Sequence, residues 1–327
     1  MSLDFDSARL PNRNLTSEHH EWRAQLRRFF DREVIPFAAQ WDEDGSIPSE
    51  LWPKAAAVGI LGLGYPEAYG GVSDGIDIWH KNILNEELAR IAVGGVSATL
   101  MVHGIGLPPV INFASEAIKS EVAPQVLAGT KRISLAITEP GAGSDVAHLS
   151  TTACLDGDHY VVNGAKTYIT GGMNANWFTT AVRTGGEGAG GVSTLLIAAD
   201  APGVSRTALD KKQGWWCSDT ATIYFDNVRV PVSHLIGEEN RGFKVIMNNF
   251  NAERMGMSAA MEAFSRVCLE DAVQWARERQ TFGQRLADHQ VIRHKIAEMK
   301  QRINATQAYL QLLSEQIQAG TEHAGDI

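Results

Sequence analysis

The sequence predicts an α+β fold in three parts: an N-terminal α-helical domain over residues 1–130, a middle β-barrel or sandwich over 131–237, and a C-terminal helical bundle over 238–327. In the first and last parts, apolar residues recur at the spacing of an amphipathic helix. In the middle part, short β-rich runs are separated by turn residues. At 327 residues the chain is long enough to divide into more than one domain.

The N-terminal part reads as a series of helices. Apolar side chains recur among charged ones over Glu18–Gln40, as in a helix with one buried face. Pro48–Ala57 predicts a shorter helix, and Ile76–Ile91 and Glu116–Leu127 predict two more.

The middle part reads as strands. Asp156-Gly157-Asp158 predicts a hairpin between Thr151–Leu155 and His159–Val162. Further strands are expected at Arg132–Thr138, Trp177–Thr184, Ser193–Ala199 and Thr220–Phe225.

One glycine-rich run in this part, Gly186–Gly191, formally matches the GxGxxG dinucleotide fingerprint. That fingerprint needs a strand before it and a helix after it. Strand-like sequence lies on both sides here, so a hairpin loop is the better interpretation.

Two apolar stripes predict the C-terminal bundle. The first comprises Phe243, Met247, Phe250, Met257, Met261, Phe264 and Cys268, on a helix expected from about Asn240. The second comprises Ile292, Ile296, Met299, Ile303, Leu310, Leu313 and Ile317.

Composition narrows the function classes. The net charge of −9 argues against a nucleic-acid binder with a broad basic face. Cys154, Cys217 and Cys268 are far apart and odd in number, which favours a reducing compartment. No signal peptide, membrane span, HExxH metal motif, EF-hand loop or GxSxG elbow is apparent, so neither a metal site nor a membrane is expected. The prediction is a cytoplasmic protein, with a mitochondrial matrix protein lacking its transit peptide as the open alternative.

The most informative stretch is Ile137–Val146, which follows a strand-like run. Pro140 stiffens the turn, and Gly141 and Gly143 allow backbone to approach a flat or charged ligand. Ser144 and Asp145 add polar acceptors. This composition predicts a loop that leans against a cofactor; a plain surface loop is the alternative.

Further segments follow in a recognisable order: Asn163–Gly172, Phe225–Pro231, Arg277–Gly283 and His289-Gln290. Together with the Ile137–Val146 loop, this set resembles the acyl-CoA dehydrogenase family of flavoproteins over nearly the whole chain. The helix–β–helix order is also that of the family.

The resemblance implies FAD as cofactor, held without a Rossmann loop. Backbone and hydroxyl groups that match the family's flavin contacts belong to Leu135, Ala136, Ile137, Thr138, Gly143, Ser144, Tyr168, Ile169 and Thr170. Tyr168 stands where many members carry Trp, so an aromatic residue is kept.

The family also implies a flavin site shared between subunits of a homotetramer. Arg279 and Thr281 match residues that reach the pyrophosphate of a flavin bound mainly by a neighbouring subunit, and Phe282, His289 and Gln290 complete that set. A solvated charge run is the alternative for Arg279, and a structural role is the alternative for His289.

Glu253 is the candidate catalytic base. It lies where the first stripe passes from Phe250 to Met257, and burial on such a seam would raise the pKa of its carboxyl group. An ion pair with a basic neighbour is the alternative. Most family members place this Glu near the C-terminus, but isovaleryl-CoA and long-chain dehydrogenases use a Glu on the helix that matches Glu253-Arg254. By the same resemblance, Arg254, Asn251 and Ser144 hold the thioester substrate.

The implied reaction is α,β-dehydrogenation of an acyl-CoA to a trans-2-enoyl-CoA in fatty acid β-oxidation. Glu253 would take the pro-R α-proton while the β-hydride moves to flavin N5, and electrons would pass to an electron-transferring flavoprotein. Two alternatives remain open: a flavin oxidase or monooxygenase on the same fold, and a non-enzymatic, DNA-associated relative.

Overall fold

The computed structural model describes residues 3–321, apart from the side chains of Asn249 and Asn251. Its chain divides into two compact units. The first combines the segments Met1–Pro36, Gly75–Ala92 and Arg254–Ile327, and the second combines Phe37–Asp74 and Val93–Glu253. Each unit is therefore assembled from segments that are far apart in sequence, and the three predicted domain ranges stay a prediction.

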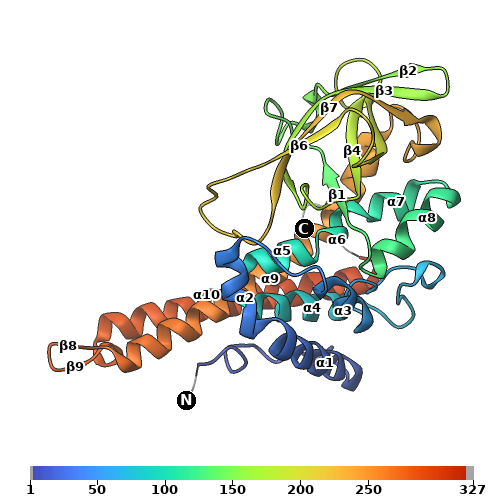
Figure 1. The fold of residues 1–327 in the computed structure, drawn as a ribbon. Coiled ribbons are helices and arrows are strands. Elements are labelled where there is room, and N and C mark those ends of the chain that lie inside the picture. The colour runs from blue at the N-terminus through green and yellow to red at the C-terminus, as the bar shows by residue number, and fades with distance from the viewer. Residues whose placement is uncertain (1–2, 322–327) are drawn as a thin grey trace. The chain divides into compact units, whose positions relative to one another are not determined.

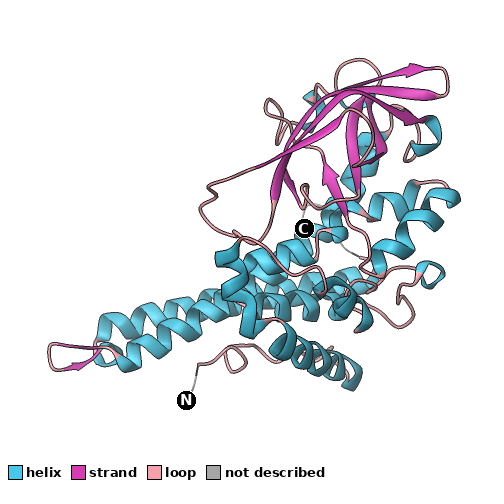
Figure 2. Cartoon of the chain, viewed as in Figure 1, coloured by secondary structure: helices cyan, strands magenta, loops and turns pink. Residues whose placement is uncertain are grey.

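The first unit is helical apart from one small hairpin (Figures 1 and 2). Its elements are α1 (Ser17–Glu33), α4 (Ile78–Arg90), the later part of α9 (Gly242–Glu278), β8 (Gln280–Thr281), β9 (Gln284–Arg285) and α10 (Gln290–Ala319). The apolar face predicted for α10 is confirmed, because Ile303 and Leu313 are buried and the other members are at least partly covered.

The helix predicted over Glu18–Gln40 is confirmed except for a break at one residue, which divides it in two. The chain leaves helical geometry at Val34 (φ −127°, ψ −62°), which separates α1 from α2 (Ile35–Asp44). Pro36 explains the break, because it has no N–H to donate and its ring crowds the preceding turn. Helical periodicity continues through the break, so the apolar pattern does not reveal it.

The apolar stripe predicted for α9 is confirmed only in its first part. Phe243, Met247 and Phe250 pack against a buried cluster of the second unit. Further along, Met257 and Met261 are about half exposed, at 56% and 46%, and Cys268 is exposed, although Phe264 packs against another buried cluster. The buried face of this part comprises Met255, Ala259, Glu262, Ala263, Arg266, Leu269, Val273 and Ala276.

This buried face lies two residues, or about half a helical turn, away from the predicted stripe. Glu262 and Arg266 belong to it because they are paired with each other, 3.0 Å apart. A buried charge is tolerated when it is paired, so charged residues on the packed face misled the prediction.

The same packed region holds a larger ionic cluster. Glu87 is fully buried and accepts hydrogen bonds from Arg23, Arg27 and Arg90 at 2.8–3.0 Å. Burial alone would raise the pKa of Glu87, but the Arg27 and Arg23 guanidinium groups hold it below its usual range. Removing one partner from such a cluster is expected to cost several kcal/mol, roughly 3–5, because a buried charge is left uncompensated.

The second unit combines short helices with one curled sheet (Figure 1). The helices are most of α2, α3 (Leu51–Ala57), α5 (Gly94–Leu100), α6 (His103–Gly106), α7 (Pro108–Phe113), α8 (Glu116–Leu127) and the first part of α9. The strands are β1 (Ile133–Ala136), β2 (Thr152–Asp156), β3 (His159–Thr170), β4 (Trp177–Arg183), β5 (Val192–Ala198), β6 (Val204–Ala208) and β7 (Thr220–Pro231).

The strands form a seven-stranded sheet in the order β1-β4-β2-β3-β7-β6, with β5 paired to β4. Buried side chains from alternate strand positions fill its core, including Val162, Phe178, Leu195, Ile223 and Phe225. The α+β fold with a middle β-rich part is thus confirmed. Strand β6 was not predicted, because its run Val-Ser-Arg-Thr-Ala has few apolar residues and only partial burial.

The hairpin predictions are also confirmed. β2 pairs with β3 in antiparallel register from Thr152↔Asn163 to Asp156↔His159. β4 and β5 are antiparallel partners, so Gly186–Gly191 is a hairpin loop and not a dinucleotide fingerprint. The Arg183 side chain connects this loop to a neighbouring segment, because it donates hydrogen bonds to the carbonyl oxygens of Gly186 in the loop and of Leu149.

Within residues 3–321, no single helix has the length and apolar character needed to cross a membrane. One bent pair of helical segments, Gly94–Leu100 with His103–Phe113, meets the requirement by length and composition alone, with a bend of 44°.

Candidate active site

The loop after β1 is a closed turn pinned at both ends. The backbone N–H of Glu139 donates to the carbonyl of Ala142 at 2.8 Å, and that of Ala142 donates back at 3.2 Å. Gly141 and Gly143 are exposed, and a Cβ built on Gly141 would meet nothing within 4 Å. The glycines therefore face open space, as expected for a loop that leaves room for a ligand.

A buried ion pair lies beneath this turn. Lys166 on β3 is fully buried, and its Nζ donates to Glu139 Oε1 at 2.7 Å and to the carbonyl of Ile137 at 3.1 Å. The Glu139 carboxylate also accepts from the backbone N–H groups of Ser150 and Thr151.

Burial and pairing act differently on the two partners. Burial raises the pKa of Glu139, but Lys166 and the hydrogen-bond donors lower it to about 2. Burial lowers the pKa of Lys166 to about 8, against the opposite effect of Glu139. The pair is therefore ionised at neutral pH, and the lysine is its more labile member.

Strand β3 is interrupted just after Lys166. Lys166 pairs with Ile223 and Ile169 pairs with Ala221, so the register shifts between them. Tyr168 lies in this bulge with φ +59° and an exposed fraction of 64%. A large aromatic residue in the left-handed region is strained, and such residues are concentrated at functional sites.

The predicted flavin contacts of the second unit lie around this bulge and the end of β1. Strand β1 pairs only with β4 among the strands described, so its other edge takes no part in a strand ladder. Thr138 and Thr170 are partly exposed and Ser144 is exposed, so their hydroxyl groups are accessible. Ala136 and Ile169 are buried, so they can contribute backbone groups only.

The remaining predicted contacts lie in the first unit, at the β8–β9 hairpin. Arg279 is exposed directly after α9, and Thr281 ends β8. Phe282 and Gly283 form the two-residue turn, both with positive φ (+53° and +75°). Phe282 is 98% exposed, so its ring packs against almost nothing within the chain.

His289 supports this hairpin. Its Nε2 lies 3.2 Å from Thr281 Oγ1, and its Nδ1 lies 3.1 Å from the Gln284 side-chain nitrogen. Its ring also meets the edge of Phe282, with centroids 6.4 Å apart. The structural alternative for His289 thus has a concrete basis, while Gln290 begins α10 with an exposed side chain.

Glu253 lies on α9 with a half-buried side chain, and Arg254 beside it is exposed. The buried seam on which the sequence prediction placed Glu253 is not present in the form expected, since the packed face has moved from the Met257 stripe to the Met255 side. Asn251 belongs to the helical backbone of α9, but its side chain lies outside the part of the chain that the structure describes.

One cluster of possible metal ligands exists among residues 3–321, formed by His19, Asp77 and His80. The backbone N–H of Thr16 donates to His19 Nδ1 at 3.0 Å, so the ring proton is on Nε2, which lies 3.0 Å from Asp77 Oδ1. A metal on Nε2 would move that proton to Nδ1, where it would face the Thr16 N–H. Asp77 also caps α4, and the cluster is explained as a helix cap.

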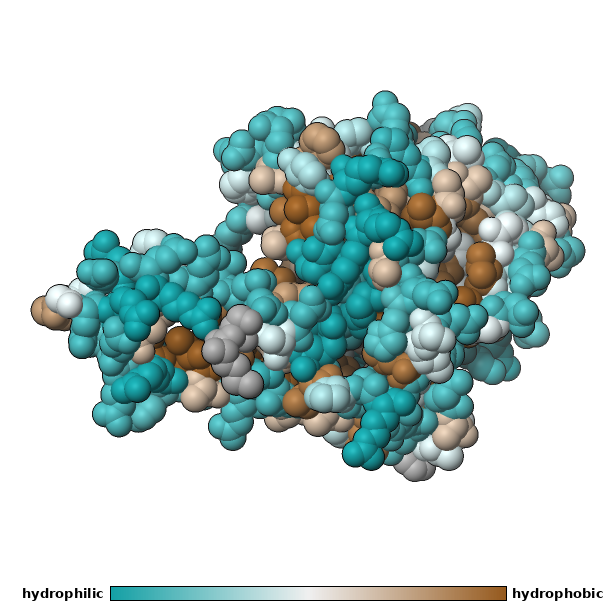
Figure 3. Space-filling model, turned by 90° about the horizontal axis from the view of Figure 1, so that it is seen from below, coloured by the Kyte–Doolittle hydropathy of each residue, from teal (hydrophilic) through white to brown (hydrophobic). Residues whose placement is uncertain are grey.

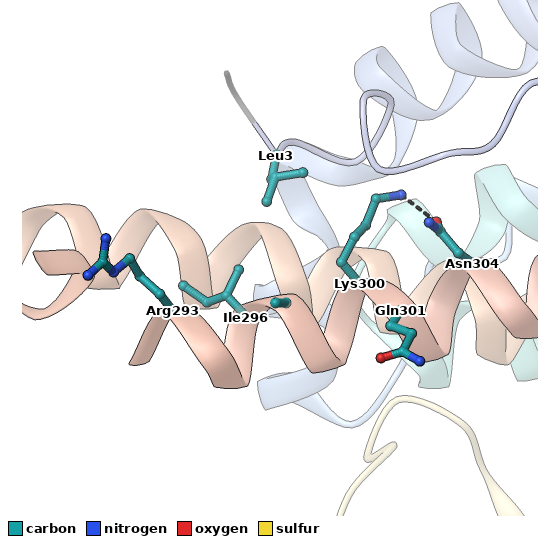
Figure 4. Close-up of a pocket in the computed structure, with 7 residues that line it drawn as sticks. Leu3, Arg293, Ile296, Lys300, Gln301 and Asn304 are labelled. Atoms are coloured by element: carbon teal, nitrogen blue, oxygen red, sulfur yellow. Dashed lines mark hydrogen bonds between the residues drawn. The ribbon is translucent and has the colours of Figure 1, made fainter. Parts of the chain in front are cut away.

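A pocket of about 520 Å³ lies beside α10 in the first unit. Figure 4 shows its lining side chains, including Leu3, Ile296 and Lys300, and the hydrogen bond from Lys300 to Asn304. None of the predicted site residues lines it. Figure 3 shows hydrophobic residues between hydrophilic ones on the part of the first unit that ends in the β8–β9 hairpin. Trp275 on α9 and Val291 and Tyr309 on α10 are among the exposed apolar residues.

Three family models match consecutive parts of the chain: the acyl-CoA dehydrogenase N-terminal domain over residues 16–130, the middle domain over 134–228 and the C-terminal domain over 240–327. The chain belongs to the acyl-CoA dehydrogenase family. As a member it is a flavoprotein oxidoreductase that acts on acyl-CoA.

Individual relatives agree with this assignment. Acyl-CoA dehydrogenase AFT10-1 of Alternaria alternata is 37% identical over 97% of this chain and 78% of its own length. A probable acyl-CoA dehydrogenase from Mycobacterium abscessus has a TM-score of 0.90 and 44% identity, over 94% of this chain and 81% of its own. A glutaryl-CoA dehydrogenase from Mycobacterium smegmatis in complex with FADH2 has a TM-score of 0.87 and 25% identity, over 95% of this chain and 79% of its own.

Lys166 and Glu139 were not among the residues predicted to form the site. Both lie inside its motifs, but a Glu before Pro and a Lys in a polar strand look like surface residues. A signal was available: Val162 and Lys166 occupy even positions of β3, and that register predicts an inward-facing side chain at 166.

Proposed function

We propose that this protein catalyses FAD-dependent α,β-dehydrogenation of an acyl-CoA thioester, giving a trans-2-enoyl-CoA. The observation that carries the proposal is the surface around the end of β1. It combines a strand edge without a second strand partner, at least partly exposed Thr138, Ser144 and Thr170, and an exposed, strained Tyr168. These features suit a flat, polar-edged ring system with an attached phosphate chain.

These residues fit a flavin. The backbone of Leu135–Thr138 can bond the polar edge of its ring system, and Tyr168 can pack against the ring. In the proposed assembly, Arg279 and Thr281 of the β8–β9 hairpin reach the pyrophosphate of a flavin held by another subunit. Arg suits this role because its planar group can donate two parallel hydrogen bonds to phosphate.

Glu253 is proposed as the base. Its carboxylate takes the α-proton, the α-carbon–hydrogen electron pair becomes the new double bond, and the β-hydrogen leaves as hydride. When bound, FAD supplies the hydride acceptor. Arg254, Asn251 and Ser144 are proposed to hold the thioester, so that proton removal and hydride loss occur in one aligned geometry.

We further propose an electron-transferring flavoprotein as the physiological acceptor and a homotetramer as the assembly. The functional test is an acyl-CoA panel, varied in chain length and branching, with loss of flavin absorbance followed without oxygen and turnover followed with a dye acceptor. Bleaching by at least one acyl-CoA is expected. No bleaching by any of them contradicts the proposal, and rapid reoxidation of the bleached flavin in air favours the oxidase instead.

A further inference from the structure

The two chain segments proposed to face the flavin ring are joined by one buried contact set. The carbonyl of Ile137 accepts from Lys166 Nζ, and the carbonyl of Thr138 accepts from the backbone N–H of Thr167 at 2.8 Å. The segment after β1 is thereby attached to β3 at the two residues immediately before Tyr168.

Glu139 extends this attachment to a third segment. Its Oε1 is 2.7 Å from Lys166 Nζ, while Oε2 accepts from the Ser150 N–H at 2.6 Å and the Ser150 hydroxyl at 2.7 Å. One carboxylate therefore fixes the turn after β1, the approach to β2, and β3. Charge-assisted bonds of this kind are shorter and stronger than bonds between neutral groups.

The position of Lys166 in its strand links the pair to Tyr168. Lys166 is the last residue of β3 in regular register with β7 before the bulge, at Lys166↔Ile223. Its side chain is 0% exposed and that of Glu139 is 2% exposed. A charge held there without solvent needs its partner, so the pair fixes where the regular strand stops and the bulge begins.

We propose that Lys166 is a positioning residue for the flavin, and that the Lys166–Glu139 pair holds Leu135–Thr138 and Tyr168–Thr170 in the relative placement that the flavin ring requires. The inference rests on the proposed function. Neither residue has to touch the flavin, because the effect is transmitted through the Ile137 carbonyl and the bulge at Tyr168.

The test compares FAD affinity with folding stability in four proteins: wild type, Lys166→Met, the double variant Lys166→Met/Glu139→Gln, and the control Lys131→Met. Lys131 is exposed and lies just before β1. FAD binding to the apoprotein is read from flavin fluorescence, and stability from denaturant unfolding of the same preparations.

Lys166→Met is expected to raise the FAD dissociation constant about tenfold or more, the size expected when a charge-assisted bond is lost from a buried site. The double variant removes both charges, so it is expected to recover folding stability while FAD affinity stays low. Lys131→Met is expected to match wild type in both measurements. The double variant keeps the test valid if Lys166→Met alone does not fold.

The pH profile supplies a second readout. Glu139 and Arg183 are the charged groups that act on Lys166, and its pKa is lowered to about 8. FAD affinity should therefore fall as pH rises through about 8 in wild type and stay flat in Lys166→Met. Folding stability should not fall with it: because the folded pKa lies below the ordinary value, the unfolded chain binds more protons in this range and stability from this group rises with pH.

Equal FAD affinity in wild type and Lys166→Met overturns the inference and leaves the proposed function standing. Recovery of both stability and FAD affinity in the double variant also overturns it, because the pair is then only structural. A wild-type protein that binds no flavin overturns the proposed function itself, and the inference with it.

Discussion

The loop after β1 and the β8–β9 hairpin are both proposed flavin contacts, yet the surrounding fold supports them very differently. The loop is closed by its own backbone, sits on a buried ion pair and is attached to β3. The hairpin has a turn of two positive-φ residues, and its aromatic tip is 98% exposed. His289 connects the hairpin to the start of α10, the helix that follows it.

This difference suggests that the loop and the hairpin contribute to flavin binding in different ways. The loop and β3 form a preorganised surface, which binds a ligand without a further ordering cost. The hairpin combines two positive-φ turn residues with an exposed aromatic tip, and we propose that a second subunit covers this tip. Helix α9 belongs to both units, because Gly242–Glu253 is assigned to the second unit and the rest of the helix to the first.

The largest effect on activity is expected at Glu253, because it is proposed to act as the catalytic base. Glu253→Gln keeps the side-chain size but cannot accept a proton. Reductive bleaching by acyl-CoA should fall at least ~100-fold, the lower range for loss of a general base. FAD content should not change.

The matched control is Asp271→Asn, which removes an exposed carboxylate from the same helix. It is expected to bleach like wild type. Near-normal bleaching in Glu253→Gln would show that Glu253 is an ion-pair partner and that the base lies elsewhere.

An intermediate effect is expected at Arg279, on the hairpin side of the comparison. Arg279→Ala should weaken FAD retention about tenfold, the size of a lost charge-assisted bond, and should loosen the oligomer. Size-exclusion chromatography with flavin absorbance measures both. Arg277→Ala is the control for the charge run, and an equal loss in both variants would favour the solvated-charge alternative. A monomer that holds FAD at full occupancy would contradict the proposal that the flavin site is shared between subunits.

The smallest effect on the fold is expected at Phe282. Phe282→Asn should leave folding stability unchanged or raise it by up to about 1 kcal/mol, because Asn adopts positive φ more easily than Phe. FAD retention should still fall several-fold if the ring completes a flavin site in another subunit. A clear loss of stability in the isolated chain would mean that the ring already packs within its own chain.

The sequence predicted the architecture well because its signals are local. Turn residues at Asp156–Asp158 and strand-like sequence on both sides of Gly186–Gly191 sufficed to predict two hairpins. The break at Val34 and the packed face of α9 were not predictable in the same way. They depend on contacts between segments that are distant in the sequence. On α9, for example, the charged residue Arg266 is buried because it is paired with Glu262, although periodicity assigns a buried position to an apolar residue.

The same contrast between local and long-range signals applies to the candidate site. Motifs indicated the residues of the loop and of the hairpin, because each motif is a continuous run. The Lys166–Glu139 pair joins residues 27 positions apart and becomes visible only when β3 and the turn after β1 are placed together. Single-sequence patterns carry no information about such pairings.

The most direct test of the central claim is an experimental structure of the assembled protein with FAD. The flavin ring is expected to lie against Leu135–Thr138 and Tyr168–Thr170 of one subunit, with its pyrophosphate near Arg279 of another. A flavin bound at Gly186–Gly191, or one contacted entirely by a single subunit, would contradict the account.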